Sequence, residues 1–226
     1  MRFVAACWLS ALLASAAFAP AEASETAAAP PELADVLERM ATSAGVEARF
    51  EERKELALLA APLESRGVIY FSPPDRFARF TLAPGFTALV VDGEAVQLRE
   101  GRDGDLVDLS GNPVARVFVD NIVVLWSGDR EQLERHYTAE FRGTLADWEL
   151  RLAPRREPLS RVIDAITLHG DADDVREMRI IEKDGDRTIT RFETLSSDRS
   201  FSAVELERIF DGREPLGGSV AERSDR

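Results

Sequence analysis

The side chains that could perform chemistry are few in this sequence and stand far apart. His136 and His169 are its two histidines, and neither has a second histidine at metal-binding spacing. The sequence holds no glycine-rich phosphate loop and no GxSxG nucleophile turn. Each histidine therefore fits a surface or strand-end position, and we expect no metal site and no catalytic site.

Two groups of carboxylates could suggest cation binding or acid–base catalysis. Asp171, Asp173 and Asp174 lie close together, but no EF-hand loop follows them, so a polar turn between strands explains them better. Glu51 and Glu52 are neighbours in a predicted strand, where successive side chains point to opposite faces. We therefore expect no cofactor and no enzymatic activity. A hydrolase using scattered acidic residues is an alternative that turnover of an acyl ester would reveal.

Cys7 is the one cysteine, and it lies in an N-terminal segment typical of a secretory signal peptide. Residues 3–18 are almost entirely apolar, and Ala21-Glu22-Ala23 forms a small-residue cleavage site. A membrane anchor is the alternative, although the apolar run is short for a bilayer. We predict cleavage near Ala23, a periplasmic location and a processed chain without a thiol. The predicted organisation is 1–23 signal peptide, 24–30 linker, 31–210 single domain and 211–226 disordered tail.

The composition favours an apolar ligand over a nucleic acid. The chain has 28 Lys and Arg against 41 Asp and Glu, a net charge of −13, which repels phosphate backbones and anionic headgroups. It has 12 Phe but only 2 Tyr, so its aromatic side chains mostly lack a polar group. We expect no nucleic acid partner.

The spacing of apolar residues, which predicts the helices and strands, changes along the chain. A helical pattern begins at Pro31 and ends at Gly45, and a period of two then marks strands joined by tight turns. A second helical stretch interrupts the strands, with Asp129 as the expected cap of its last part. The expected helices cover 31–45, 114–126, 129–136, 158–163 and 203–210. The expected strands cover 46–51, 67–71, 77–82, 87–91, 95–99, 106–109, 137–141, 145–152, 163–168, 175–181 and 188–194. This pattern predicts an α+β fold with a large antiparallel sheet of about eleven strands covered by short helices.

Short motifs in this order resemble the periplasmic outer-membrane lipoprotein carrier (LolA-like) family. The motifs are Ala48-Arg49-Phe50, Ser65-Arg66-Gly67, Pro74-Asp75-Arg76-Phe77, Val90-Val91-Asp92-Gly93 and a hairpin over 178–192 with Asp184-Gly185 at its tip. The resemblance implies a curved sheet shaped as a half-open β-barrel, with helices as a lid over an apolar cavity for acyl chains. It also implies a monomer that receives a lipoprotein or lipid from an inner-membrane donor and delivers it to an outer-membrane acceptor.

The candidate site consists of apolar residues that we expect to face the helical lid, together with one arginine. The candidates are Phe50, Phe71, Phe77, Arg79, Phe80, Leu82 and Val90 from the strands, and Phe118, Ile122 and Trp126 from the helix at 114–126. Plain core packing is the alternative for each apolar residue. A one-residue error in register would move a whole strand's set to the other face.

One position departs from the family pattern. The carriers resembled here have an arginine directly before the proline of the strand-opening motif, where it helps to hold the lid shut, and this sequence has Pro73 there. Arg79 shares a strand face with Phe77, so one hypothesis is that Arg79 bonds lid carbonyls instead. The alternative is that Arg79 extends to solvent. The departure leaves open a free lipid as cargo, and also a sensor or interaction domain that binds a membrane-associated protein.

Overall fold

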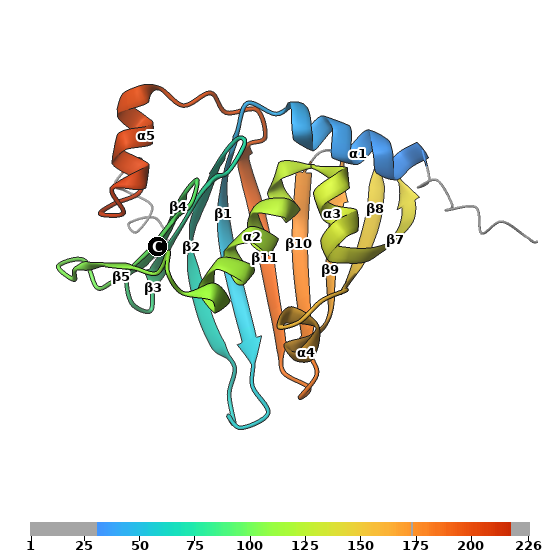
Figure 1. Ribbon diagram of the computed structural model, residues 1–226, viewed down its shortest axis with the longest axis horizontal. Coiled ribbons are helices and arrows are strands. Elements are labelled where there is room, and N and C mark those ends of the chain that lie inside the picture. The colour runs from blue at the N-terminus through green and yellow to red at the C-terminus, as the bar shows by residue number, and fades with distance from the viewer. Residues whose placement is uncertain (1–30, 173, 218–226) are drawn as a thin grey trace, which may run out of the picture.

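One antiparallel sheet of eleven strands organises the molecule, as shown by a computed structural model that describes residues 31–172 and 174–217 (Figure 1). The strand order is β6-β5-β4-β3-β2-β1-β11-β10-β9-β8-β7. The strands are β1 (Val46–Glu55), β2 (Leu63–Ser72), β3 (Arg76–Ala83), β4 (Thr87–Asp92), β5 (Ala95–Glu100), β6 (Leu106–Asp108), β7 (Tyr137–Thr144), β8 (Asp147–Pro154), β9 (Ile163–Asp171), β10 (Asp174–Glu182) and β11 (Arg187–Ser196). The predicted signal peptide and linker, residues 1–30, lie outside the described residues.

Five helices complete the described structure. They are α1 (Pro31–Thr42), α2 (Pro113–Ser127), α3 (Arg130–His136), α4 (Leu159–Val162) and α5 (Ala203–Phe210). The predicted cap at Asp129 is confirmed, because the Gln132 N–H donates to Asp129 Oδ1 at 3.0 Å. Ser202 caps α5 and forms a capping box with Glu205. No helix within the described part of the chain is long and apolar enough to cross a membrane.

The first and last strands pair at the centre of the sheet. Phe50 of β1 lies opposite Phe192 of β11, and β2 lies on the other side of β1. Two meanders, β2 to β6 and β7 to β10, extend outward from this central pair. The sheet curves around the helices, which confirms the predicted α+β fold with eleven strands and helical covers (Figure 1).

The two faces of the sheet have separate hydrophobic clusters. Because side chains alternate along a strand, Phe77 and Phe80 of β3 belong to different clusters. The face that α1, α2 and α3 cover is called the inner face below, and its cluster includes Leu133, Trp148 and Leu152. The opposite, outer face is apolar over β2, β3 and β4, where α5 covers it. Helices α1 to α3 thereby shield the inner cluster from water, and α5 shields the outer cluster.

The chain after α5 packs against the outer face instead of forming a disordered tail from residue 211 onward. Arg99 Nε donates to the Gly212 carbonyl oxygen at 3.0 Å, and the Leu216 N–H donates to the Tyr70 hydroxyl at 3.0 Å. Gly212 and Pro215 are buried. This contact corrects the prediction for 211–217, because a buried arginine and tyrosine satisfy their polar groups there. Residues 218–226 lie outside the described residues.

Candidate ligand-binding interior

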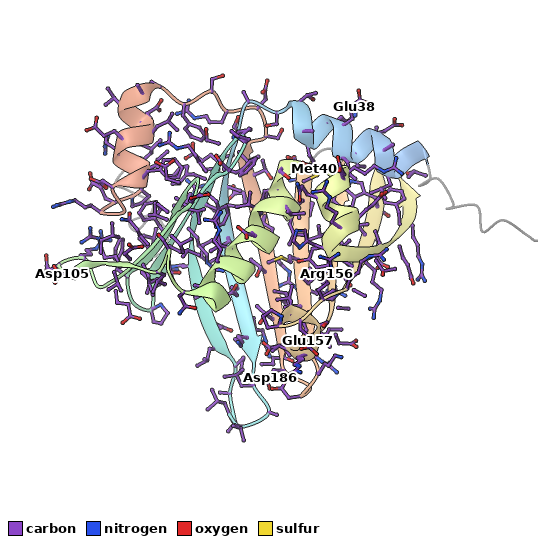
Figure 2. The ribbon with its side chains drawn as sticks, in the orientation of Figure 1. Glu38, Met40, Asp105, Arg156, Glu157 and Asp186 are labelled. Atoms are coloured by element: carbon purple, nitrogen blue, oxygen red, sulfur yellow. The ribbon has the colours of Figure 1, made fainter. Side chains whose placement is uncertain are left out.

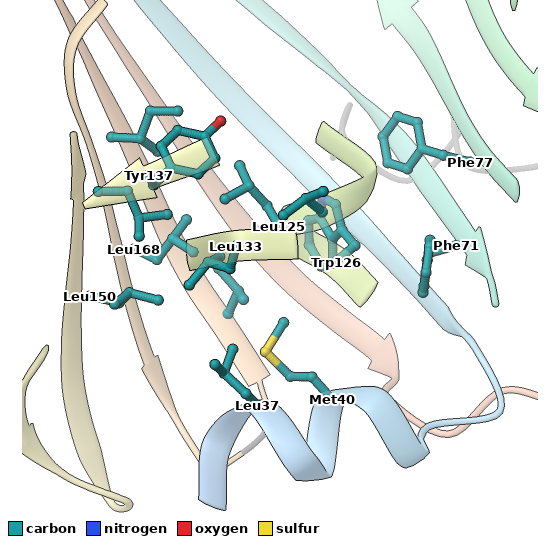
Figure 3. Packing of buried hydrophobic residues seen from close by; sticks show 14 of the residues in the cluster. Leu37, Met40, Phe71, Phe77, Leu125, Trp126, Leu133, Tyr137, Leu150 and Leu168 are labelled. Atoms are coloured by element: carbon teal, nitrogen blue, oxygen red, sulfur yellow. The ribbon is translucent and has the colours of Figure 1, made fainter. Parts of the chain in front are cut away.

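The candidate site is the space between the inner face and helices α1, α2 and α3. Leu37 and Met40 of α1, Leu125 and Trp126 of α2 and Leu133 of α3 point toward this space (Figure 3). On the sheet side the cluster includes Phe71, Phe77, Leu150 and Leu168 (Figure 3). The interior is therefore apolar on both the helical and the sheet side.

Side chains fill the part of this interior that lies under the C-terminal half of α2. Trp126 packs edge-on against Phe192, with ring centroids 5.2 Å apart and an interplanar angle of 88°. A cavity of about 10 Å³ lies beside it, lined in part by Met40, Val46 and Val175. A single water needs about 10–15 Å³ of such volume, so this part of the interior is closed.

The structure brings five of the predicted site residues to the inner side and separates three others. Phe50, Phe71, Phe77 and Trp126 belong to the inner cluster, and Arg79 lies over the Phe50 ring. By contrast, the outer cluster contains Phe80, Leu82 and Val90, which pack with Ile209 and Phe210 of α5. Their expected position facing the lid is corrected, because strand alternation places them one residue out of phase with Phe77. Phe118 and Ile122 belong to α2, but their side chains lie outside the described residues.

Arg79 bonds within the sheet. Its Nη2 donates to Glu52 Oε1 at 2.9 Å, and its guanidinium carbon lies 4.2 Å from the centroid of the Phe50 ring. The cation–π contact and the ion pair hold the side chain along β1. Its described partners therefore differ from both sequence-based hypotheses, which gave it lid carbonyls or solvent.

Glu52 is the centre of a polar group on the inner face. Besides Arg79 it accepts hydrogen bonds from Thr190 Oγ1 at 3.0 Å and Ser65 Oγ at 3.4 Å. Burial alone would raise the pKa of the Glu52 carboxyl, but the charge and hydrogen bonds of Arg79, with those of Thr190 and Ser65, lower it overall. Glu52 is therefore ionised at neutral pH. Glu51, its neighbour, is exposed, as the prediction of opposite faces required.

Helix α2 is fastened to the sheet by an arginine of its own. Arg116 Nη1 donates to the carbonyl oxygens of Glu94 at 2.7 Å and Gly93 at 3.2 Å, in the turn between β4 and β5. Arg116 Nε also lies 3.0 Å from Asp120 Oδ1, one helical turn further along α2. The side chain of Arg116 thereby joins α2 to the β4–β5 turn at the edge of the sheet.

The Tyr137 hydroxyl is buried within the inner cluster. Tyr137 is fully buried, and its hydroxyl has no hydrogen-bond partner among the described residues. Burial raises the pKa of the Tyr137 hydroxyl, so it is neutral. It can donate one hydrogen bond in surroundings that are otherwise apolar.

Sequence reasoning missed Arg116, Glu52 and Thr190. Arg116 was detectable as a long cation in the first turns of the predicted lid helix, four residues before Asp120. Glu52 could have been noticed as a charge on the same strand face as Phe50, two residues away. Thr190 gives no such signal, because its contact with Glu52 spans 138 residues of sequence.

The family model described as outer membrane lipoprotein carrier protein LolA-like matches residues 23–203. The chain belongs to this LolA-like family of outer-membrane lipoprotein carrier proteins. No curated protein matches the sequence.

Several solved structures are similar to this chain at low sequence identity. MucB is 15% identical with a TM-score of 0.46, covering 79% of this chain and 63% of MucB. The MucA/MucB complex of Pseudomonas aeruginosa gives 18% identity and a TM-score of 0.43, covering 77% of this chain and 60% of that one. The LolA superfamily protein NE2245 from Nitrosomonas europaea gives 10% identity and a TM-score of 0.39, covering 77% and 95%. The chain thus spans less than two thirds of the first two structures.

Proposed function

We propose that the protein is a periplasmic carrier that binds the acyl chains of a lipoprotein or lipid between the inner face and helices α1 to α3. The observation that supports this proposal is the continuous apolar cluster between two layers, one of which is a set of separate helices. In this proposal the carrier receives its cargo from an inner-membrane donor and delivers it to an outer-membrane acceptor. Membership of the LolA-like family supports the same role.

An apolar interior suits this task energetically. Each buried CH₂ group contributes about 0.8 kcal/mol, so a chain of fourteen such groups gains roughly 11 kcal/mol on leaving water. Opening α2 exposes apolar side chains such as Trp126 and Leu125, which the entering chain then covers. Cargo and cover therefore compete for the same surface, and binding displaces the cover without breaking the sheet.

A binding role also fits the polar groups of the interior. The Glu52 carboxylate is already paired with Arg79, and the Tyr137 hydroxyl has a raised pKa. Neither group is prepared to act as a base or nucleophile at neutral pH. We therefore propose binding without catalysis.

The experiment begins with the full chain, exported and purified from a periplasm, analysed by native mass spectrometry and lipid extraction. We expect a bound acyl species at near one-to-one, whose chemistry distinguishes a lipoprotein from a free lipid. A brominated fatty acyl chain should then quench Trp126, because bromine quenches only at contact. A Trp126→Phe variant, which keeps Trp148 in the same cluster at its β8 end, should lose most of that quenching.

Two results would contradict the proposal. A clean unliganded mass combined with no quenching by the brominated chain would make the interior a packed core. Equal quenching in the Trp126→Phe variant would place the chain at the β8 end beside Trp148 and contradict binding under α2. Either result would favour a domain that binds a membrane-associated protein.

A further inference from the structure

The loop between β1 and β2 is the most exposed apolar segment among the described residues. It runs Leu56-Ala57-Leu58-Leu59-Ala60-Ala61-Pro62 and continues into Leu63, the first residue of β2, without a single charged or hydrogen-bonding side chain. Leu58 is 96% exposed, Leu63 53% and Leu59 46%. Figure 1 shows this loop at the tip of the β1–β2 hairpin, projecting beyond the other elements at the foot of the molecule. We call these eight residues the apolar loop.

Neighbouring elements hold the apolar loop in place and enlarge its surface. The Ala57 N–H donates to Asp186 Oδ1 at 2.8 Å, in the turn between β10 and β11. The Lys183 N–H in that turn donates to the carbonyl oxygen of Val162 at 2.8 Å. Val162, the last residue of α4, is itself 42% exposed. The apolar loop, the β10–β11 turn and α4 therefore form one connected end of the molecule.

Some of the charges at this end form ion pairs. Lys54 Nζ lies 3.4 Å from Glu182 Oε1 across β1 and the β10–β11 hairpin. Arg161 Nε lies 2.9 Å from Glu157 Oε1 beside α4. Asp184 and Asp186 of the β10–β11 turn lie close to Glu182, so carboxylates also stand beside the apolar tip.

We propose that the apolar loop docks the protein on the surface of a lipid bilayer by inserting Leu58 and Leu59 among the acyl chains. A bilayer accepts apolar side chains on a narrow projection, whereas a stable protein interface needs about 800 Å² from each partner. One hairpin tip of alanine, leucine and proline is too small for that area. The carboxylates beside the tip and the net charge of −13 favour zwitterionic headgroups over anionic ones.

Docking at this loop would bring the interior close to the membrane. The loop continues strand β1, and Glu52 and Phe50 of the inner face lie only four to six residues before Leu56. At about 3.3 Å per residue, four residues of strand span roughly 13 Å. An acyl chain leaving the bilayer at the loop would pass the Glu52–Arg79 pair before it reaches the apolar cluster at Phe50. Transfer of an acyl chain between bilayer and interior rests on the proposed carrier function, but docking of the loop on a bilayer does not.

The test is flotation of the full chain with protein-free phosphatidylcholine vesicles. The variant Leu58→Glu with Leu59→Glu should lower the bound fraction at least tenfold. Val204→Glu is the matched control, because Val204 is 66% exposed but lies on α5, at the opposite end of the molecule (Figure 1). The control should float like the parent. Thermal unfolding of both variants checks that they fold.

A second measurement locates the contact directly. In a Cys7→Ser background, a polarity-sensitive fluorophore on Leu58→Cys should shift to the blue with vesicles, and one on Val204→Cys should not. Failure of the parent to float, equal flotation of the loop variant, or binding only to vesicles containing inner-membrane proteins would each overturn the proposal. A parent that floats but takes up no acyl chain would contradict the carrier function while supporting the docking loop.

Discussion

Replacing Arg116 with methionine tests whether α2 is a releasable cover. Arg116→Met keeps an apolar side chain of similar length but removes the bonds to the Gly93 and Glu94 carbonyls. A charged donor to a neutral carbonyl contributes on the order of 1 kcal/mol at a side chain that is 33% exposed. Because one nitrogen, Nη1, makes both bonds, their energies do not simply add. Losing both should shift the equilibrium toward an open cover by about 1.5 kcal/mol, or roughly tenfold.

The assay is the rate at which the protein takes up a fluorescent fatty acyl chain, with hydrogen exchange of the α2 amides as a readout without ligand. Both rates should rise about tenfold in Arg116→Met. Arg79→Met is the matched control, since Arg79 bonds Glu52 within the sheet. We expect it to lower stability but to leave amide exchange in α2 unchanged. Two results would show that Arg116 does not hold α2 on the sheet. One is that Arg116→Met matches the parent in amide exchange and in acyl-chain uptake. The other is that Arg79→Met raises amide exchange in α2 by the same factor.

Three further substitutions test the sheet and the interior. Because Arg79 lowers the pKa of Glu52 below its unfolded value, the pair stabilises the fold above about pH 4.5 and loses its contribution as pH falls through the folded pKa. Arg79→Met should therefore lower the free energy of unfolding by about 2 kcal/mol at pH 7, which corresponds to about 4–8 °C in melting temperature. The loss should be smaller at pH 4, and an equal loss at both pH values would contradict the Arg79–Glu52 pairing. Gly67→Ala should destabilise severely in urea unfolding, because a Cβ there would lie 1.8 Å from the Phe80 carbonyl oxygen, and a near-neutral result would refute the close approach. Tyr137→Phe should change the unfolding free energy by less than about 1 kcal/mol, whereas a larger loss would reveal a partner of the hydroxyl.

The fold was accessible from the sequence because its strands are local hairpins with clear turn signals. Asp92-Gly93 joins β4 to β5, and Asp184-Gly185 lies in the turn before β11, as the alternating pattern around them predicted. The long-range step was harder to predict. Nothing in the local pattern shows that β1 pairs with β11, because that pairing depends on contacts far apart in sequence.

The candidate site could be predicted only in part because this sheet is apolar on both faces of β3. Phe77 and Phe80 both look like core residues in the sequence, but they face different helices. The helix at 203–210 was expected, and its role as cover of the outer face was not. Without that role, the sequence pattern assigns Phe77, Phe80 and Leu82 to one cavity.

The pairing of β1 with β11 has a consequence for how the chain reaches its native state. A polypeptide that emerges N-terminus first, from a ribosome or a translocation channel, can form the β2–β6 meander early from neighbouring residues. The pairing of β1 with β11 must form later, because contacts such as Glu52 with Thr190 join residues 138 positions apart. Until nearly the whole chain has emerged, β1 can pair with β2 on one side only, and the inner cluster lacks the residues of β7 to β11. The native sheet can therefore be completed only after β11, the last strand, has been synthesised.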